Sequence, residues 1–225
     1  MNAKRTAVVA WHLAVGLTLG LAVSPAQGKD KPQPNVLDEG KLDKSWFGAE
    51  VEFREADEID YFWVRPGFSP EGKTLHFVDW PEPVFLGEGA HKRDTKDMRL
   101  AQEMNSGMAE VFDVAFANAF QKRLATSRTR GDVLVEGRIV DCSTGAVAAK
   151  VLVGFGAGSG STTIDLRFKD ATSGELLAAL HHRVVSGTTW STTDSKFVNW
   201  VDEIVDEFAK KGMETLYKKG DRVRE

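Results

Sequence analysis

The sequence predicts an α+β fold: an antiparallel four-stranded meander, preceded by N-terminal strands and covered on one face by two helices. The helices are predicted because apolar residues recur at three- and four-residue spacing over residues 94–124 and again over 193–216. The sheet is predicted because residues 132–185 alternate between apolar and polar side chains. A chain of 225 residues that is 42% hydrophobic and 28% charged is long enough to bury one substantial core.

The first 28 residues have the pattern of a secretory signal peptide (1–28). Lys4 and Arg5 give a positive start, residues 6–23 form an apolar run, and the small residues that follow suit a signal peptidase. An uncleaved membrane anchor is the alternative, but the run is near the lower length limit for spanning and contains His12. We therefore expect cleavage, no stable membrane span afterwards, and a periplasmic or secreted protein.

Cysteine usage and net charge exclude several kinds of covalent anchor, cross-link and partner. Cys142 is the single cysteine, so no intramolecular disulfide can form, and no cysteine follows the apolar run to carry a lipid anchor. Cleavage removes two basic residues and no acidic ones, which changes the formal net charge from −4 to −6. Nucleic-acid binding needs a concentrated basic face, so we expect no nucleic-acid partner.

The rest of the chain divides into a leader, one domain and a tail. Residues 29–44 are charged and contain two prolines, which predicts a flexible leader. Residues 45–217 form a single α+β domain, and residues 218–225 form a charged tail. At the start of the domain, the aromatic-rich runs 59–65 and 73–80 are each followed by proline and predict two strands.

The two helical patterns begin at residues suited to capping. Asp94 or Thr95 can cap the first helix, and Thr193 or Asp194 can cap the second. Charged side chains fill the outer face of the second pattern, so we interpret its carboxylates as ordinary surface charge.

A short internal sequence repeat, which we call the internal echo, predicts two tight turns. Residues 135–145 can be laid over residues 164–174, so that a branched residue, an arginine, an apolar residue, an aspartate and a glycine coincide. Each copy is typical of strand, turn and strand. The carboxylates of Asp141 and Asp170 would accept hydrogen bonds from turn amides, and the glycine would supply a positive φ.

Alternation around these turns completes the predicted meander. The runs 147–155 and 162–168 both alternate, which gives the four strands one apolar face and one polar face. On the second of these runs the polar face carries Asp165, Arg167 and Lys169. We expect this face to be solvated and the apolar face to be covered by the helices.

A glycine-rich loop at residues 154–160 is the one segment that suggests phosphate binding. A phosphate cradle needs glycines followed by a helix, whereas an alternating strand follows this loop and no Lys-Ser or Lys-Thr pair closes it. We interpret it as a hairpin connection or a sheet edge that can meet a partner's backbone. Its candidate contacts are Gly156, Gly158 and Gly160.

Aromatic residues gather between residues 46 and 85 and give a second candidate surface. Tyr61, Trp63 and Trp80 could form a stacking platform for a glycan or a groove for a peptide. The alternative, which we favour, is that these aromatic side chains hold an irregular segment against the sheet, because large aromatic side chains are mostly buried.

No recognisable catalytic apparatus is present, and we assign no catalytic, cofactor-binding or metal-binding residues. His181 and His182 are neighbours on a predicted strand, so their side chains point to opposite faces and cannot easily chelate one ion. The chain has no Gly-x-Ser-x-Gly elbow, and Cys142 has no base implied beside it.

The glycine-rich and turn motifs carry a resemblance. The stretch 153–160, the Asp170 to Gly174 turn and the run 61–67 resemble uncharacterised bacterial envelope families named only as domains of unknown function. Such families imply export, often a lipid anchor, and no established activity. This chain departs from them in lacking the lipidation cysteine, which favours a free periplasmic or secreted form.

These observations lead to one functional expectation with two alternatives. We expect an exported, non-enzymatic protein that binds an envelope protein or a cell-wall component, in envelope assembly or maintenance. The first alternative is a glycan- or small-ligand-binding module that uses the N-terminal aromatic cluster. The second is a hydrolase with an unrecognised site.

Overall fold

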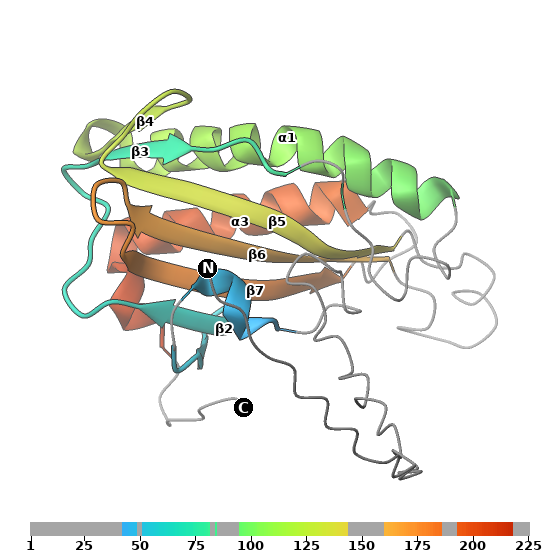
Figure 1. The fold of residues 1–225 in the computed structure, drawn as a ribbon, viewed down its shortest axis with the longest axis horizontal. Helices are drawn as coiled ribbons and strands as arrows, with labels where there is room; N and C mark the ends of the chain where they lie inside the picture. The colour runs from blue at the N-terminus through green and yellow to red at the C-terminus, as the bar shows by residue number, and fades with distance from the viewer. Residues whose placement is uncertain are drawn as a thin grey trace, which may run out of the picture. The chain divides into compact units, whose positions relative to one another are not determined.

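A computed structural model describes residues 42–48, 51–81, 84, 95–143, 160–185 and 193–217. Within them the chain forms one seven-stranded sheet, two long helices and three short 3-10 helices (Figure 1). In chain order these are η1 (Lys44–Phe47), β1 (Arg54–Ala56), β2 (Ile59–Val64), β3 (Thr74–Phe77), α1 (Thr95–Phe120), η3 (Gln121–Arg123), β4 (Ala125–Ser127), β5 (Val133–Ser143), β6 (Ser161–Asp170), β7 (Leu176–Val185), α3 (Thr193–Lys211) and η4 (Met213–Leu216).

The sheet is mostly antiparallel, and the strand order is β1-β2-β7-β6-β5-β3-β4. β5, β6 and β7 form its centre, and β1 and β2 extend it antiparallel on the β7 side. On the other side β3 lies parallel to both β4 and β5. The parallel pairing follows from the long helical connection through α1, which returns the chain to the same end of the sheet. The α+β class is therefore as expected, with strands of the N-terminal section on both sides of the central three and β1 and β4 at the edges.

The four-stranded meander was wrong in one respect, because β5 and β6 pair directly with each other. Their register runs from Val133 opposite Asp170 to Ser143 opposite Ser161, which leaves no place for a strand between them. β5 continues through Asp141, where a turn was expected. The pairing of β5 with β6 shifts register between Ile139 and Asp141. A bulge can accommodate the extra residue within a long pair of strands. The expected strand 147–155 lies outside the described residues.

The second expected turn is confirmed between β6 and β7. The Asp170 carboxylate accepts hydrogen bonds from the backbone N–H groups of Thr172 and Ser173, at 3.0 and 2.8 Å. Gly174 has φ +72°, a left-handed conformation that glycine adopts without steric cost.

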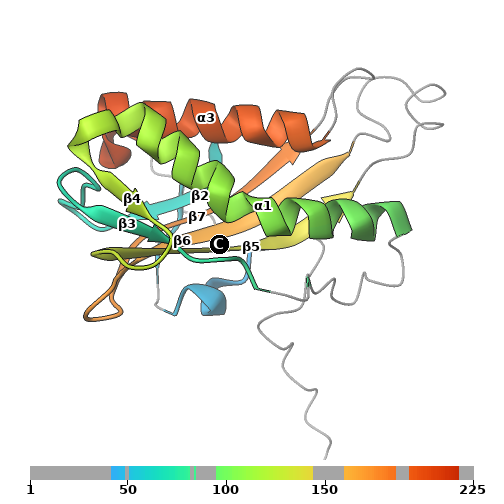
Figure 2. The ribbon, with the colours of Figure 1, turned by 90° about the horizontal axis from the view of Figure 1, so that it is seen from above.

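α1 and α3 cover one face of the sheet, which we call the helix face (Figure 2). α1 begins at Thr95, and the expected cap Asp94 lies outside the described residues. Phe116 of α1 is central to the core, since its ring contacts those of Phe168 on β6 and Phe208 on α3. The apolar periodicity of both helices therefore faces the sheet as expected.

The opposite face of the sheet is covered too, which corrects the expectation of a solvated, charged surface. Figure 2 shows η1 on the side of the sheet away from the helices, and we call this side the η1 face. There Phe47 of η1, Val51 and Phe53 are buried in a second apolar cluster with side chains of β7. Asp165 on β6 is 0% exposed. A charged face can be covered when its charges pair across strands, and alternation alone does not reveal such pairing.

Asp60 of β2 holds the end of β7. Its carboxylate accepts a hydrogen bond from the backbone N–H of Arg183 at 3.0 Å. His182 Nδ1 lies 3.0 Å from the same oxygen. Burial would raise the pKa of Asp60, but His182 and the Arg183 N–H outweigh it and lower the pKa from 3.8 to about 2.

This depressed pKa predicts an acid-dependent contribution of Asp60 to stability. A lowered carboxylate pKa stabilises the folded state above the ordinary value, and that contribution disappears as the pH falls through the folded value. Wild type should therefore be more stable than Asp60→Asn at about pH 6, and the difference should shrink towards about pH 2. Urea midpoints of both proteins across this range measure the effect. A gap that stays constant with pH would contradict it.

Candidate functional site

Four polar and aromatic side chains form one row across the η1 face. Arg138 on β5, Asp165 on β6, His181 on β7 and Tyr61 on β2 occupy directly opposed positions of neighbouring strands. Asp165 Oδ2 accepts a hydrogen bond from Arg138 Nε at 2.7 Å, and Asp165 Oδ1 lies 2.7 Å from His181 Nδ1. The Tyr61 ring meets the His181 ring edge to face, with centroids 5.5 Å apart. The row therefore ties four strands together around one buried carboxylate.

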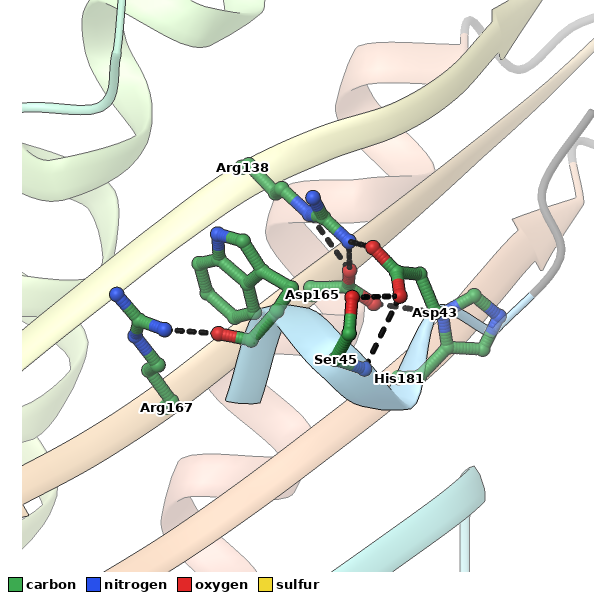
Figure 3. A network of polar contacts seen from close by, with 7 residues as sticks. Asp43, Ser45, Arg138, Asp165, Arg167 and His181 are labelled. Atoms are coloured by element: carbon green, nitrogen blue, oxygen red, sulfur yellow. Dashed lines mark hydrogen bonds and ion pairs between the residues drawn. The ribbon is translucent and has the colours of Figure 1, made fainter. Parts of the chain in front are cut away.

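Two arginines of this face hold η1 on the sheet (Figure 3). Asp43 caps η1, since its Oδ1 accepts hydrogen bonds from Ser45 N at 3.0 Å and Ser45 Oγ at 2.6 Å. The other oxygen of Asp43 lies 3.3 Å from Arg138 Nη2. Arg167 on β6 donates a hydrogen bond to the backbone oxygen of Trp46. Asp43 therefore links the cap of η1 to the buried row, although the sequence placed it in the leader.

The same two arginines fix the ring of Trp46. The Arg138 guanidinium carbon lies 4.7 Å from the ring centroid and that of Arg167 lies 4.2 Å from it. Such cation–π contacts are worth about 0.5–2 kcal/mol each, depending on how far water is excluded. Arg167 is held in turn by Glu136, whose Oε2 lies 2.6 Å from Arg167 Nε and 3.5 Å from Lys169 Nζ. The indole is thus oriented by charged groups whose own positions are fixed.

The half-buried aromatic side chains of this face form the candidate site. Trp46, Tyr61 and Trp63 all pack against the apolar cluster of Phe47 and Phe53 while remaining partly exposed. We call these three residues, together with the charged group of Glu136, Arg167 and Lys169, the aromatic face. It combines ring surfaces for stacking with cationic donors and a carboxylate acceptor for directed hydrogen bonds.

The Asp165–His181 pair has the composition of a proton-transfer dyad and lies among buried contacts between strands. Both side chains are buried, and the two oxygens of Asp165 are engaged by Arg138 and His181. The hydroxyl of Ser45 donates to Asp43. Within the described ranges, no group of three or more His, Cys, Asp and Glu side chains is placed to hold a metal ion.

The structure brings together two of the six candidate residues from the sequence. Tyr61 and Trp63 lie on the aromatic face. Trp80 lies instead on the helix face, where it is 6% exposed and stacks on Phe112 of α1 with centroids 6.2 Å apart. Gly160 immediately precedes β6, whereas Gly156 and Gly158 lie outside the described residues.

Sequence reasoning missed the residues that organise the site. Arg138 and Arg167 occupy equivalent positions in the internal echo, and this repetition was the available signal. Trp46 stood in the aromatic-rich stretch, but nothing in its neighbourhood indicated two arginines from distant strands.

Comparison with known proteins adds a family and distant structural similarities. Residues 71–189 match the family described as Domain of unknown function (DUF4410). No curated protein matches the chain. Helices long and apolar enough to cross a membrane do not occur among the described residues.

Three solved structures share general similarity with the chain. A PelC variant dodecamer from Paraburkholderia phytofirmans has a TM-score of 0.43 and 7% identity, covering 67% of this chain and 95% of PelC. A Xanthomonas campestris protein with a DUF330 family model has a TM-score of 0.35 and 10% identity, covering 75% of this chain and 95% of that one. A PDZ domain protein from Parabacteroides distasonis has a TM-score of 0.37 and 10% identity, covering 72% of this chain and 36% of that one.

Proposed function

The chain belongs to the DUF4410 family, and we propose that this member is an exported, non-catalytic protein that binds a cell-envelope component on its aromatic face. The observation that carries the proposal is the arrangement of Trp46, Tyr61 and Trp63, which are partly exposed on one side of the sheet. The signal-peptide pattern of residues 1–28 supports export.

The chemistry of the aromatic face favours a cell-wall glycan as the bound component. Indole and phenol rings stack on the apolar faces of sugar rings at little entropic cost, since their side chains are already held. Trp46 is held by Arg138 and Arg167, so it need not be ordered on binding. Arg167 and Lys169 beside Glu136 supply donors and an acceptor for hydroxyl and carboxylate groups of such a glycan.

The arrangement supports binding more than hydrolysis. A general base or acid must reach the reacting group, whereas Asp165 is fully buried and His181 is 3% exposed. The charged side chains of the row are paired with side chains of neighbouring strands and with Asp43, which caps η1. In this proposal these residues position the surface above them.

Calorimetric titration with soluble peptidoglycan fragments tests the proposal. We expect saturable binding by wild type, and an affinity about tenfold lower or worse for Trp63→Ala, the scale of loss when an aromatic anchor is truncated. Trp63→Phe should retain most of the affinity because it keeps a ring for stacking. Val198→Ala, which shortens an exposed apolar side chain of α3, is the control and should bind as wild type does.

Two results would count against glycan binding at this face. One is the absence of saturable heat for wild type with every fragment tested. The other is unchanged affinity in a Trp63→Ala protein whose circular dichroism shows that it is folded.

A further inference from the structure

A second surface, on the helix layer, has features that the fold does not explain. An open groove of about 390 Å³ runs along the outer side of α1 beside the loop that follows β4. α1 residues between positions 106 and 118 line it, and Arg128 of the loop closes one side. Figure 2 shows α1 on the side of the sheet away from η1, so this groove is separate from the aromatic face.

Two carboxylates in the groove lack a compensating cation. Glu110 and Asp113 lie one helical turn apart, and neither carboxylate has a hydrogen bond or ion pair to another described residue. Like charges at this spacing disfavour a helix, and the positions three and four residues away from each hold no lysine or arginine. The groove's own cation, Arg128, is already paired with Asp79.

Three other carboxylates on the helices have a cation one turn away. On α3, Asp206 and Glu207 pair with Lys210 and Lys211 one turn later. On α1 itself, Glu103 pairs with Arg99. Asp202 and Glu203 of α3 are exposed and likewise have no ion pair to another described residue, so what distinguishes Glu110 and Asp113 is that they line the groove.

An exposed apolar side chain lies between these carboxylates and the end of the groove. Val114 is 51% exposed, more than any other large apolar side chain among the described residues. It lines the groove together with Ala117, and the polar side chains of Ser106 and Asn118 complete the lining. The surface thus offers two negative charges, an apolar patch and hydrogen-bonding groups at its ends.

We propose that this groove docks a basic segment of a partner protein. A lysine or arginine side chain of the segment lies between Glu110 and Asp113, and a neighbouring apolar side chain covers Val114 and Ala117. The charge of the groove favours a basic partner. The positive charge of Arg128 is balanced by Asp79, so the negative charges of Glu110 and Asp113 remain to be neutralised by the partner. The site does not depend on glycan binding at the aromatic face.

Nuclear magnetic resonance of the nitrogen-15-labelled chain tests this proposal. The probe is an acetylated nonapeptide with two lysines and two leucines on a glycine–serine background, compared with the same peptide carrying glutamate for lysine. With the lysine peptide, amide signals of α1 around Glu110 and Asn118 and of Arg128 should shift. The glutamate peptide should leave them unchanged.

Variants separate this groove from general attraction between charges. Glu110→Gln combined with Asp113→Asn should weaken binding of the lysine peptide about tenfold, the combined scale of two exposed ion pairs. The same variant should remain folded, because it removes a repulsion within α1. Asp202→Asn with Glu203→Gln removes two charges from the outer face of α3 and should leave the affinity unchanged.

Three results would overturn the proposal. The first is equal affinity of the groove variant and wild type, or shifts spread equally over α3. The second is spermine binding as tightly as the lysine peptide at the same residues, which would indicate a small polyamine. The third is a dimer in sedimentation that Val114→Glu abolishes, which would assign the groove to a second copy of the chain.

Discussion

Replacement of Arg138 by alanine is expected to lower the free energy of unfolding by about 3–5 kcal/mol, the cost of leaving a buried charge without its partner. Asp165 is 0% exposed and accepts a 2.7 Å hydrogen bond from Arg138, so its carboxylate would keep His181 alone among these contacts. The substitution also removes the contact to Asp43 and one of the two cation–π contacts of Trp46. Urea-induced unfolding followed by circular dichroism measures the loss.

Two further variants distinguish the stability lost by breaking the buried pair from the effect of removing any arginine charge. Arg99→Ala removes an arginine whose pair with Glu103 is 73% and 66% exposed, and should change stability by no more than about 0.5 kcal/mol. Arg138→Met combined with Asp165→Leu should recover only part of the loss, because apolar side chains can replace the buried ion pair but His181, which is 3% exposed, then loses its contact with Asp165. A loss below about 1 kcal/mol in Arg138→Ala would contradict the role of the buried row.

Trp80→Ala is expected to cost about 3–5 kcal/mol, the range for deleting a large aromatic side chain from a core. Trp80 stacks on Phe112 and is 6% exposed, so its removal leaves a cavity between α1 and β5. Thermal unfolding of the variant measures the effect. If Trp80 instead served mainly to contact a ligand, its removal would leave stability nearly unchanged.

Gly137 provides the matched test of this packing. A Cβ atom built on Gly137 would lie 2.3 Å from Cε2 and Cζ2 of the Trp80 ring, far inside contact distance. Gly137→Ala should therefore destabilise the wild-type chain by about 1–3 kcal/mol through overpacking. In the Trp80→Ala background the added methyl group has room and should cost little. Additive effects of the two substitutions would contradict the close packing of Trp80 on Gly137.

Periodicity predicted those parts of the fold that depend on local pattern. Both helices, the strand at β2 and the turn from Asp170 to Gly174 followed from spacing and turn chemistry. The direct pairing of β5 with β6 did not, because Asp141 and Gly145 have the same local signature as a true turn. Whether such a signature becomes a turn or a bulge depends on the strand that pairs with it.

The candidate site was predictable in its aromatic part only. Tyr61 and Trp63 were identified from a strand rich in aromatic residues. Asp165 and Arg167 looked like solvated charges because they alternate with apolar residues, and burial of such groups depends on partners in distant strands. The cover itself is η1, a single 3-10 turn, and so short an element has no periodicity to detect.

The indole N–H signals of the tryptophans give the most direct measurement of binding at the aromatic face. In a titration of the nitrogen-15-labelled chain with soluble peptidoglycan fragments, the signals of Trp46 and Trp63 should shift progressively to saturation. Those of Trp80 and Trp200, which are each 6% exposed on the helix side, should stay in place. Shifts confined to Trp80 and Trp200, or unmoved signals of Trp46 and Trp63 when the fragment is bound, would contradict the proposed surface.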